Sequence, residues 1–413
     1  MDVPPKLLNN DPHGFAWGVW HDRTPRLLVQ VREAHVYGPE QRAALDALWH
    51  EVSAGHVEPL PPEAHDAVKW ASWGEGNFGK LWADAPYLWS ESYFYRRLLQ
   101  AVDFFTRGPW YFADPFAYLK DAELRTAAAE AMLAAHGELG DRRAAEQGQL
   151  KLLAALWGNR ADLGFRIGQA GTAVNEARAG LVADQSAELW AALDPPGDVI
   201  VVTDNAGQEL LADLIFADHL LAAGGADRVQ LHVKPYPYFV SDATAADVAA
   251  CVDRLGRTEA TVAVASRLKA AAAAGRFGLH THEFYAAPLP FDAMPPELAE
   301  EYARASLTIM KGDLNYRRLT GDRAWPPVTP FGDVVSYFPG PLAALRTLKS
   351  DVAVGISPAK VAELDETSPS WRTAGSHALI QVKADRGCRP VGRSLGARRG
   401  SAAEAPMSLC IIR

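Results

Sequence analysis

The stretch VIVVTDNAG, residues 199–207, decides how this chain is expected to fold. Its four apolar residues predict a buried strand, and the polar turn that follows leads into an amphipathic helix at about 206–222. The same alternation continues through the second half of the chain. Further strands are expected at 229–233, 307–310 and 352–356, with helices at about 245–255, 258–274 and 295–305. Strands alternating with helices predict a mostly parallel sheet that helices cover.

The first half of the chain has a different pattern, with Ala, Leu, Glu and Arg at helical spacing. Helices are expected at 40–57, 91–107, 120–137, 141–157 and 173–193. Trp and Tyr crowd residues 70–111, and packing between helices is favoured over base stacking as their role. We therefore predict an α/β fold with three parts: a mainly helical domain at 1–194, an α/β/α sandwich at 195–383 and a disordered tail at 384–413.

Composition narrows the class of protein. The 413 residues include 41 Lys and Arg against 50 Asp and Glu, a formal net charge of −9, which disfavours a dedicated nucleic-acid binder. No apolar run approaches the roughly 18 residues of a membrane span, and the start has no signal-peptide pattern. Three distant cysteines predict neither a disulfide framework nor a zinc cluster. A soluble, cytoplasmic protein is expected, with no membrane and no nucleic-acid partner.

Acidic and amide side chains stand where the predicted strands end. Ligands of open α/β sheets bind beyond the carboxyl ends of the strands. Asp204 and Asn205 directly follow the strand at 199–202, and Asp242 ends the segment FVSD at 239–242. Taken alone, each site favours a helix-cap interpretation. The same oxygens could instead bind a hard divalent cation.

Basic residues occur at two other strand ends. In MKGDLNYRR, residues 310–318, Lys311 ends a strand, Gly312 lets the backbone turn, and polar residues follow at once. In RTLK, Arg346 and Lys349 would share one face if the segment were helical. Lys and Arg bind phosphate groups, so oxygen donors and basic groups at one sheet edge predict a cation that orients a phosphate and lowers the pKa of a bound water.

Five segments in this order resemble the metal-dependent damage-control phosphatases, the former domain-of-unknown-function family 89. They are LWGNRADL at 156–163, DNAG at 204–207, FVSD at 239–242, KGDLNYR at 311–317 and RTLK at 346–349. The Arg-Thr-x-Lys element is typical of the third subfamily, which includes proteins named acidic residue methyltransferase. The resemblance runs from about residue 12 to 383 and leaves the tail out.

The resemblance implies a helical N-terminal part, a C-terminal α/β/α sandwich and one divalent metal at the strand ends. By this likeness the metal ligands would be Asp204, Asn205 and Asp242, which with Lys349 form the expected catalytic set. The expected substrate-binding residues are Lys311, Asp313, Leu314, Asn315, Tyr316, Arg317 and Arg346, together with Glu91 and Arg96 from the matching segment ESYFYRR at 91–97.

Members of this family hydrolyse small phosphometabolites, including sugar phosphates such as fructose 1-phosphate. The resemblance implies Mn²⁺ as cofactor, with Co²⁺, Ni²⁺ or Mg²⁺ as alternatives. A small phosphorylated substrate is therefore the expected partner, and the sequence leaves the oligomeric state open.

Rival mechanisms fit less well. A haloacid-dehalogenase-type phosphatase needs a second Asp two residues after its nucleophile, but Ala206 occupies that place, so hydrolysis by metal-activated water is favoured, with Asp204 or Asp242 as base. Carboxyl methyl transfer from S-adenosylmethionine is the alternative function, although the turn after Val202 holds only Gly207. A catalytically silent sugar-phosphate binder is a third possibility.

The segment HTHE at 280–283 contains a second possible metal motif. His280 and His282 would share one face of a strand, and zinc would then be the expected ion. No further ligand cluster supports that interpretation in the sequence, so structural or rim roles are favoured.

Overall fold

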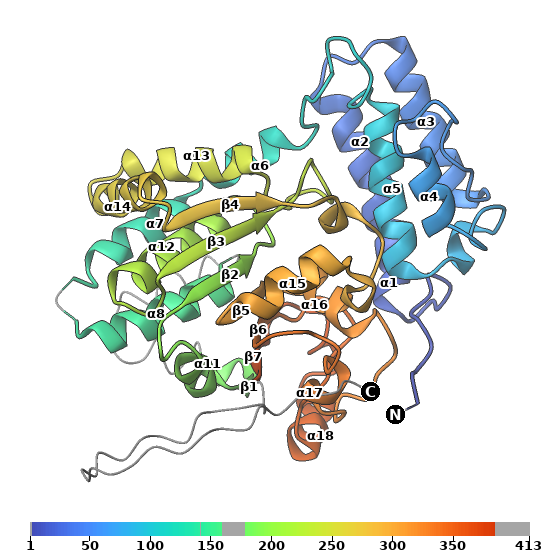
Figure 1. The fold of residues 1–413 in the computed structure, drawn as a ribbon. Coiled ribbons are helices and arrows are strands. Elements are labelled where there is room, and N and C mark those ends of the chain that lie inside the picture. Colours follow the sequence, from blue (N-terminus) through green and yellow to red (C-terminus); the bar gives the residue numbers. More distant parts are fainter. Residues whose placement is uncertain (1, 141, 159–177, 385–413) are drawn as a thin grey trace, which may run out of the picture.

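A seven-stranded sheet with helices on both faces lies at the centre of the molecule (Figure 1). The structure is a computed structural model that describes residues 2–140, 142–158 and 178–384. Its strands are β1 (Leu181–Asp184), β2 (Asp198–Val202), β3 (Arg228–Val233), β4 (Phe277–Thr281), β5 (Leu307–Lys311), β6 (Leu342–Thr347) and β7 (Ala378–Lys383). The spatial order is β1-β7-β6-β5-β2-β3-β4.

Five neighbouring strands, from β6 through β5, β2 and β3 to β4, run parallel. β7 pairs antiparallel with β6, and β1 pairs parallel with β7. From β2 the chain builds outward to β3 and β4, then returns to the other side of β2 with β5. The point where the direction of building reverses therefore lies between β2 and β5, which is where open α/β sheets bind their ligands. The predicted mixed α/β architecture with a mostly parallel sheet is confirmed.

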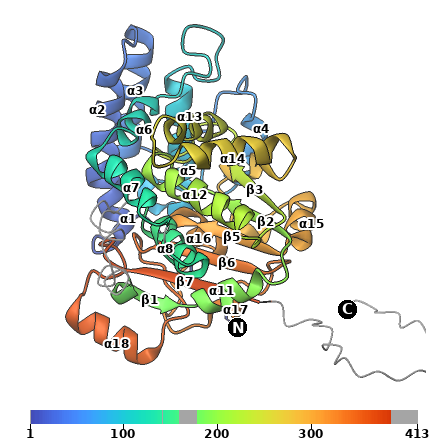
Figure 2. The ribbon, with the colours of Figure 1, turned by 90° about the vertical axis from the view of Figure 1, so that its left-hand side faces the viewer.

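Alternating side chains of the strands point to opposite faces, and both faces are buried. Val199 and Val201 of β2 join the larger core cluster, whereas Ile200 and Val202 join the second. Figure 2 views the molecule from the side of the face that carries the larger core cluster. The helices of that layer are α7 (Ala127–Gly137), α8 (Ala144–Trp157), α11 (Ser186–Ala192), α12 (Gln208–Ala222), α13 (Ala245–Gly256) and α14 (Val262–Ala273).

The opposite face is covered by elements from the last third of the chain. They are η3 (Glu283–Ala286), η4 (Phe291–Ala293), α15 (Pro296–Arg304), α16 (Gly312–Thr320), α17 (Phe331–Val334) and α18 (Pro358–Thr367). Helix α15 leads into β5 through a short turn, and α16 begins directly after that strand. The beginning of α16, directly after β5, consequently lies at the reversal point of the sheet.

The N-terminal elements form a separate helical layer beside the sheet, drawn in blue in Figure 1. They are α1 (Phe15–Gly18), η1 (Val19–Arg23), α2 (Thr24–Ala34), α3 (Pro39–Ala54), α4 (Ala67–Trp73), η2 (Trp82–Asp84) and α5 (Tyr87–Ala101), followed by α6 (Ala117–Glu123). Trp70, Trp82, Trp89 and Tyr93 are buried in one cluster between these helices. The predicted packing role of the aromatic residues is thus confirmed.

The division into domains at 194 stays a prediction, and α8 lies before that position although it packs against α12 on the sheet. Residues 385–413 of the predicted tail lie outside the described residues, as do 159–163 of the first motif. None of the helices in the described part of the chain is long and apolar enough to cross a membrane.

One strand prediction and part of one helix prediction are wrong. Residues 352–356 are buried but form no strand, because side chains rather than a neighbouring strand hold their backbone: Arg346 donates to the carbonyl of Val352, and Gln381 Nε2 donates to that of Val354 at 2.6 Å. The strand of this region is instead β6. Within the helix expected at 173–193, residues 181–184 form β1, and 173–177 lie outside the described residues.

Candidate active site

A cavity of about 170 Å³ opens where β2 and β5 end, at the reversal point of the sheet. Eight of the residues singled out in the sequence line it: Glu91, Asp204, Asn205, Asp242, Asp313, Leu314, Arg317 and Lys349. The other lining residues are Phe15, Arg23, Tyr87, Phe239, Val240 and Ser241. These eight residues come from five separate sequence regions, four of which follow β2, β3, β5 and β6, as the strand-end rule predicted; Glu91 comes from α5.

Backbone hydrogen bonds join the loop after β2 to the loop after β3. The amide of Ala206 donates to the carbonyl of Ser241 at 2.6 Å, and the amide of Ala243 donates to that of Asp204 at 2.8 Å. Asn205 and Asp242 face each other in an isolated β-bridge. The three expected ligand residues are thus held together by the backbone itself.

These side chains do not cap the helices that follow, so the cap interpretation is wrong. Helix α12 begins after Gly207, which supplies no side-chain cap. Helix α13 is capped by Thr244 and Asp247 in a capping box. The carboxylates of Asp204 and Asp242 remain available to the cavity.

Negative charge is concentrated around Asp204. Burial, followed by the carboxylates of Glu209 and Asp242, raises the pKa of Asp204 well above its usual value. Asn205 Nδ2 donates to Asp204 Oδ2 at 2.8 Å and to Glu209 Oε2 at 3.0 Å, and Asn205 Oδ1 accepts from Ser241 Oγ at 2.5 Å. Buried carboxylates that raise one another's pKa are stabilised by a cation placed between them.

Asp242 carries a buried oxygen that no described residue satisfies with a hydrogen bond. Lys234 Nζ lies 3.2 Å from this Oδ2 atom, but the two are not aligned as donor and acceptor. Burial first, only partly offset by Lys234, raises the pKa of Asp242 to about 6. Carboxylate and amide oxygens with unsatisfied lone pairs are the donor set of a hard divalent cation. Asp204, Asn205 and Asp242 fit such an ion.

Two cations that line the cavity form no ion pair with any described residue. Lys349, half-buried in the loop after β6, lies close enough to Asp204 to lower that group's pKa. Arg23 is the last residue of η1, a π-helical turn, and it lies at the exposed rim. π-Helical turns are frequent at functional sites. An anionic group in the cavity would meet both charges.

Of the two residues expected from α5, one reaches the cavity. Glu91 accepts from Arg317 Nη1 at 2.8 Å, and Asp322 takes the rest of the same guanidinium through two bonds. Arg96 does not line the cavity, because its guanidinium makes two hydrogen bonds to Asp66 at 2.6 and 2.8 Å. Arg317 lines the cavity with its charge already shared between two carboxylates.

Two further expected residues lie beneath the cavity rather than in its wall. Lys311 Nζ is 3.1 Å from Asp213 Oδ1 and 3.3 Å from Glu209 Oε1, and these carboxylates outweigh its burial and raise its pKa. Asn315 Nδ2 donates to the carbonyls of Lys311 and Thr203, at 2.8 and 3.0 Å. The two hydrogen bonds of Asn315 tie the ends of β5 and β2 together.

Arg346 and Tyr316 also point away from the cavity. Arg346 lies within β6, which ends at Thr347, so the segment is not helical and the face that Arg346 would have shared with Lys349 does not exist. Its guanidinium lies 2.7 Å from Asp313 Oδ1 and stacks over the Tyr316 ring, and the Tyr316 hydroxyl donates to Gln381. Although burial favours the neutral acid, Arg346 and Arg317 hold the pKa of Asp313 below its usual value.

The sequence interpretation missed Arg23 and Lys234. Lys234 directly follows β3, so the signal that indicated Lys311, a basic residue after a strand, could have found it. Arg23 had no such signal, because only the packing of the helical layer brings it to the sheet.

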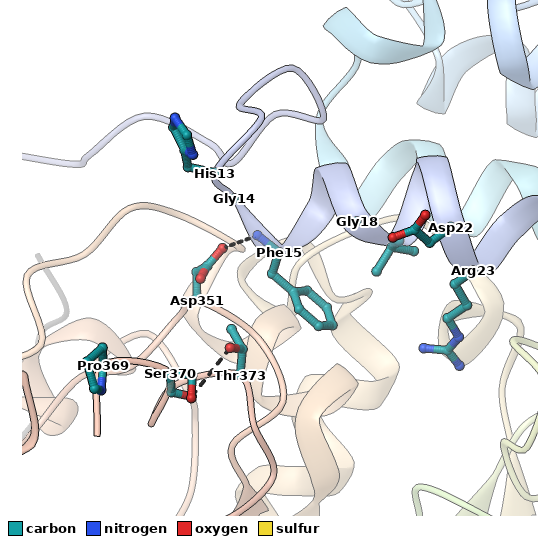
Figure 3. Close-up of a pocket in the computed structure, with 11 residues that line it drawn as sticks. His13, Gly14, Phe15, Gly18, Asp22, Arg23, Asp351, Pro369, Ser370 and Thr373 are labelled. Atoms are coloured by element: carbon teal, nitrogen blue, oxygen red, sulfur yellow. Dashed lines mark hydrogen bonds between the residues drawn. The ribbon is translucent and has the colours of Figure 1, made fainter. Parts of the chain in front are cut away.

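Arg23 and Phe15 also line a second cavity of about 650 Å³, shown in Figure 3. In that view Asp351 lies opposite Phe15, whose amide donates to it at 2.9 Å, and Ser370 and Thr373 lie near them. The two cavities share these wall residues.

Comparison with known proteins identifies the family. The description "Damage-control phosphatase ARMT1-like domain" matches residues 19–364. The chain belongs to the damage-control phosphatase family. Proteins named "Damage-control phosphatase ARMT1" are similar over 92% of this chain: that of Rattus norvegicus is 30% identical, with 98% of its length covered, and that of Bos taurus is 32% identical, with 99% covered.

A crystal structure of a DUF89 family protein from Pyrococcus horikoshii is 15% identical, with a TM-score of 0.47 over 88% of this chain and 96% of that one. Membership of the damage-control phosphatase family makes this chain a metal-dependent phosphatase that acts on a small phosphorylated substrate.

One glycine of this damage-control phosphatase is fixed by the site. Gly312 has a φ of +82°, and a Cβ there would lie 1.9 Å from Asp204 Oδ2. We expect Gly312→Ala to displace that carboxylate and lower kcat about a hundredfold, the size of effect that a 1 Å misplacement produces. Steady-state phosphate release measures it.

Gly321→Ala is the matched control. Gly321 has a similar φ of +74°, but its nearest neighbour is the flexible side chain of Arg323, at 3.2 Å. Both substitutions strain the backbone by about 1–2 kcal/mol, and only the first meets Asp204. Equal activity of the two variants would contradict the fixed position of this carboxylate.

Proposed function

We propose that this phosphatase hydrolyses small sugar phosphates such as fructose 1-phosphate, with Mn²⁺ as its preferred ion and Co²⁺, Ni²⁺ or Mg²⁺ as replacements. The proposal includes a cytoplasmic location, the compartment that the composition predicts. The observation that carries it is the pairing, in one cavity, of three oxygen donors with two cations that form no ion pair among the described residues.

In this proposal Asp204, Asn205 and Asp242 hold the divalent ion. Bound there, the ion would supply charge to the phosphoryl oxygens and lower the pKa of a water molecule. Asn205 is oriented for this by its hydrogen bonds to Ser241 and Glu209. Asp204 or Asp242 accepts the proton of the attacking water, since both carboxylates line the cavity.

Lys349 and Arg23, which lie far apart in the sequence but line the same cavity, would both bind the phosphate. Both can offset charge on the phosphoryl oxygens as the leaving oxygen departs. Arg317, already shared between Glu91 and Asp322, would position Glu91 and the floor of the cavity instead.

The sugar would extend into the second cavity, past the shared Arg23 and Phe15 (Figure 3). That wall offers Asp22, Ser370 and Thr373, whose oxygens can bind hydroxyl groups, and its volume of about 650 Å³ exceeds what a phosphate alone needs. The size and polarity of this space support a sugar phosphate as the substrate, in preference to an inorganic phosphate compound or an apolar phosphoester.

Phosphate release from a panel of sugar phosphates tests the proposal. Chelator-treated protein is assayed with Mn²⁺, Mg²⁺, Co²⁺ or Ni²⁺ added back. Release that requires the ion, is fastest with Mn²⁺ and is lost in Asp204→Ala supports it. No release from any sugar phosphate with any ion would contradict it, and binding of S-adenosylmethionine would be measured next.

Lys349→Ala is expected to weaken substrate binding. Loss of one charged contact to phosphate costs about 1.5–3 kcal/mol, so kcat/KM should fall roughly 10- to 100-fold, mainly through a higher KM. Lys360→Ala, which removes a half-buried lysine paired with Glu363 on α18, far from the cavity lining, is the control and should leave both constants unchanged. Unchanged KM and kcat in Lys349→Ala would exclude its phosphate-binding role.

A further inference from the structure

Two histidines and a glutamate lie together away from the cavity described above. His232 of β3 and His280 of β4 are paired across the parallel strands, and Glu301 reaches them from α15. His232 Nε2 lies 3.4 Å from Glu301 Oε1, and His280 Nε2 lies 3.5 Å from Glu301 Oε2. One nitrogen of each histidine and one carboxylate oxygen lie within 4.8 Å of one another.

The two Nε2 atoms are shielded from solvent, yet neither makes a hydrogen bond to any described residue. Both are near the carboxylate, but the ring N–H directions do not point at it. The His232 side chain is 0% exposed. Buried polar atoms normally find a partner, so two orphaned nitrogens facing one carboxylate indicate that something is to be bound between them.

The other nitrogen of His232 is held in place. Its Nδ1 is hydrogen-bonded to the Tyr285 hydroxyl, which contacts the Tyr302 hydroxyl at 2.6 Å. If Nδ1 donates to Tyr285, Nε2 carries the lone pair that a metal ion needs. A histidine that binds a metal through one nitrogen usually has its other nitrogen hydrogen-bonded to an oxygen.

We propose that His232, His280 and Glu301 bind a divalent cation of the borderline-soft class, Zn²⁺ in the first place. Imidazole nitrogens with one carboxylate are a common zinc donor set, with bonds of about 2.0–2.2 Å. Ligand atoms around a tetrahedral ion with such bonds are about 3.3–3.6 Å apart, and each histidine Nε2 lies at such a separation from one oxygen of Glu301, His232 from Oε1 and His280 from Oε2. The all-oxygen set of the catalytic cavity suits a harder ion, so the two sites differ in chemistry.

A cavity of about 260 Å³, lined in part by Gln230, Glu301 and Arg304, opens beside the cluster. It gives an entry path and space for a water molecule as the fourth ligand. An ion there would join β4, the edge strand of the sheet, to β3 and to α15. The site would therefore stabilise the sheet edge and is independent of the proposed function.

The sequence had offered His280 with His282, two positions along the same strand. The sequence favoured structural or rim roles over that pairing, and His282, which follows β4, caps η3: its Nδ1 accepts from the amide of Phe284, and its Nε2 lies 3.5 Å from Glu297. The partner of His280 comes instead from the neighbouring strand, which spacing along one segment could not indicate.

Zinc content of the full chain tests the site. Protein dialysed against Zn²⁺ and then against buffer is analysed for metal per chain, and unfolding temperature is measured with and without Zn²⁺. We expect Asp204→Ala with Asp242→Ala to retain one equivalent. His280→Ala and Glu301→Gln, made in the otherwise unchanged chain, should each lose one equivalent relative to it and lose part of the Zn²⁺-dependent rise in unfolding temperature.

His280 and Glu301 are chosen because their side chains are 31% and 22% exposed, so their replacement threatens the fold less than that of buried His232. His282→Ala is the matched control and should bind as much Zn²⁺ as the unchanged chain. Equal zinc content in the unchanged chain, His280→Ala and Glu301→Gln would overturn the proposal and leave a simple histidine–glutamate contact. Loss in His282→Ala as well would overturn it equally, since that result means non-specific binding.

Discussion

Asp242→Ala is expected to lower kcat/KM of the phosphatase at least about a thousandfold, and Asp204→Ala should do the same. Each substitution removes an oxygen from the proposed ion site, which would supply several kcal/mol of charge stabilisation to the reaction. The loops should keep their shape, because backbone bonds between Asp204 and Ala243 and between Ala206 and Ser241 do not involve these side chains. Steady-state rates with saturating Mn²⁺ measure the effect.

Asp198→Ala is the matched control for these variants. Asp198 lies at the other end of β2, exposed and paired with Arg228, so the same strand loses a carboxylate far from the cavity. Its activity should stay within about twofold of the unchanged chain, since exposed ion pairs contribute little. A folded Asp242→Ala protein with full activity would refute the site assignment.

Lys311→Met should cause the largest loss of stability, about 3–5 kcal/mol in the free energy of unfolding. The ammonium group is almost fully buried and is flanked by Asp213 and Glu209. Methionine fills a similar volume but leaves the buried carboxylate of Asp213 without this cation and removes the cation from beside Glu209, which is the costly way to break a buried ion pair. Denaturant titration followed by circular dichroism measures the difference.

Two further variants separate this effect from lost packing. Arg228→Met breaks an exposed ion pair on the same sheet, with half-exposed partners, and should cost less than about 1 kcal/mol. Asp213→Asn in the Lys311→Met chain removes the buried carboxylate charge that Lys311 balances in the unchanged protein. This second substitution should restore part of the stability. If Lys311→Met and Arg228→Met were equally stable, Lys311 would not be the cation that stabilises the carboxylates of Asp213 and Glu209.

The location of the candidate site could be predicted from the sequence, because its polar residues directly follow buried strands. Asp204, Asn205, Asp313 and Lys349 each stand within a few residues of a strand end, so the rule for open sheets brought them to one cavity. What such a rule cannot give is the direction of each side chain. Arg346 is adjacent to the site in sequence, yet its guanidinium turns to Asp313 and Tyr316.

Hydrophobic runs report burial and not backbone pairing, which explains the error at residues 352–356. That segment is as buried as a strand, but Gly355 has a φ of +71°. The carbonyls of Val352 and Val354 accept hydrogen bonds from side chains and not from a neighbouring strand. The true strand β6 is rich in Ala and Leu and carries little β preference. The cluster of His232, His280 and Glu301 escaped notice because it depends on pairing between strands.

The late position of β7 has a consequence for how the chain is made. Among the residues that the structure describes, β1 pairs only with β7, so Leu181 cannot pair until Ala378, roughly two hundred residues further along, has been made. During synthesis on the ribosome, β2, β3, β4 and β5 emerge earlier and can pair without it. The ion-binding loops can thus assemble on a nascent sheet whose β6 edge is still open, and that edge is where an unfinished chain would aggregate.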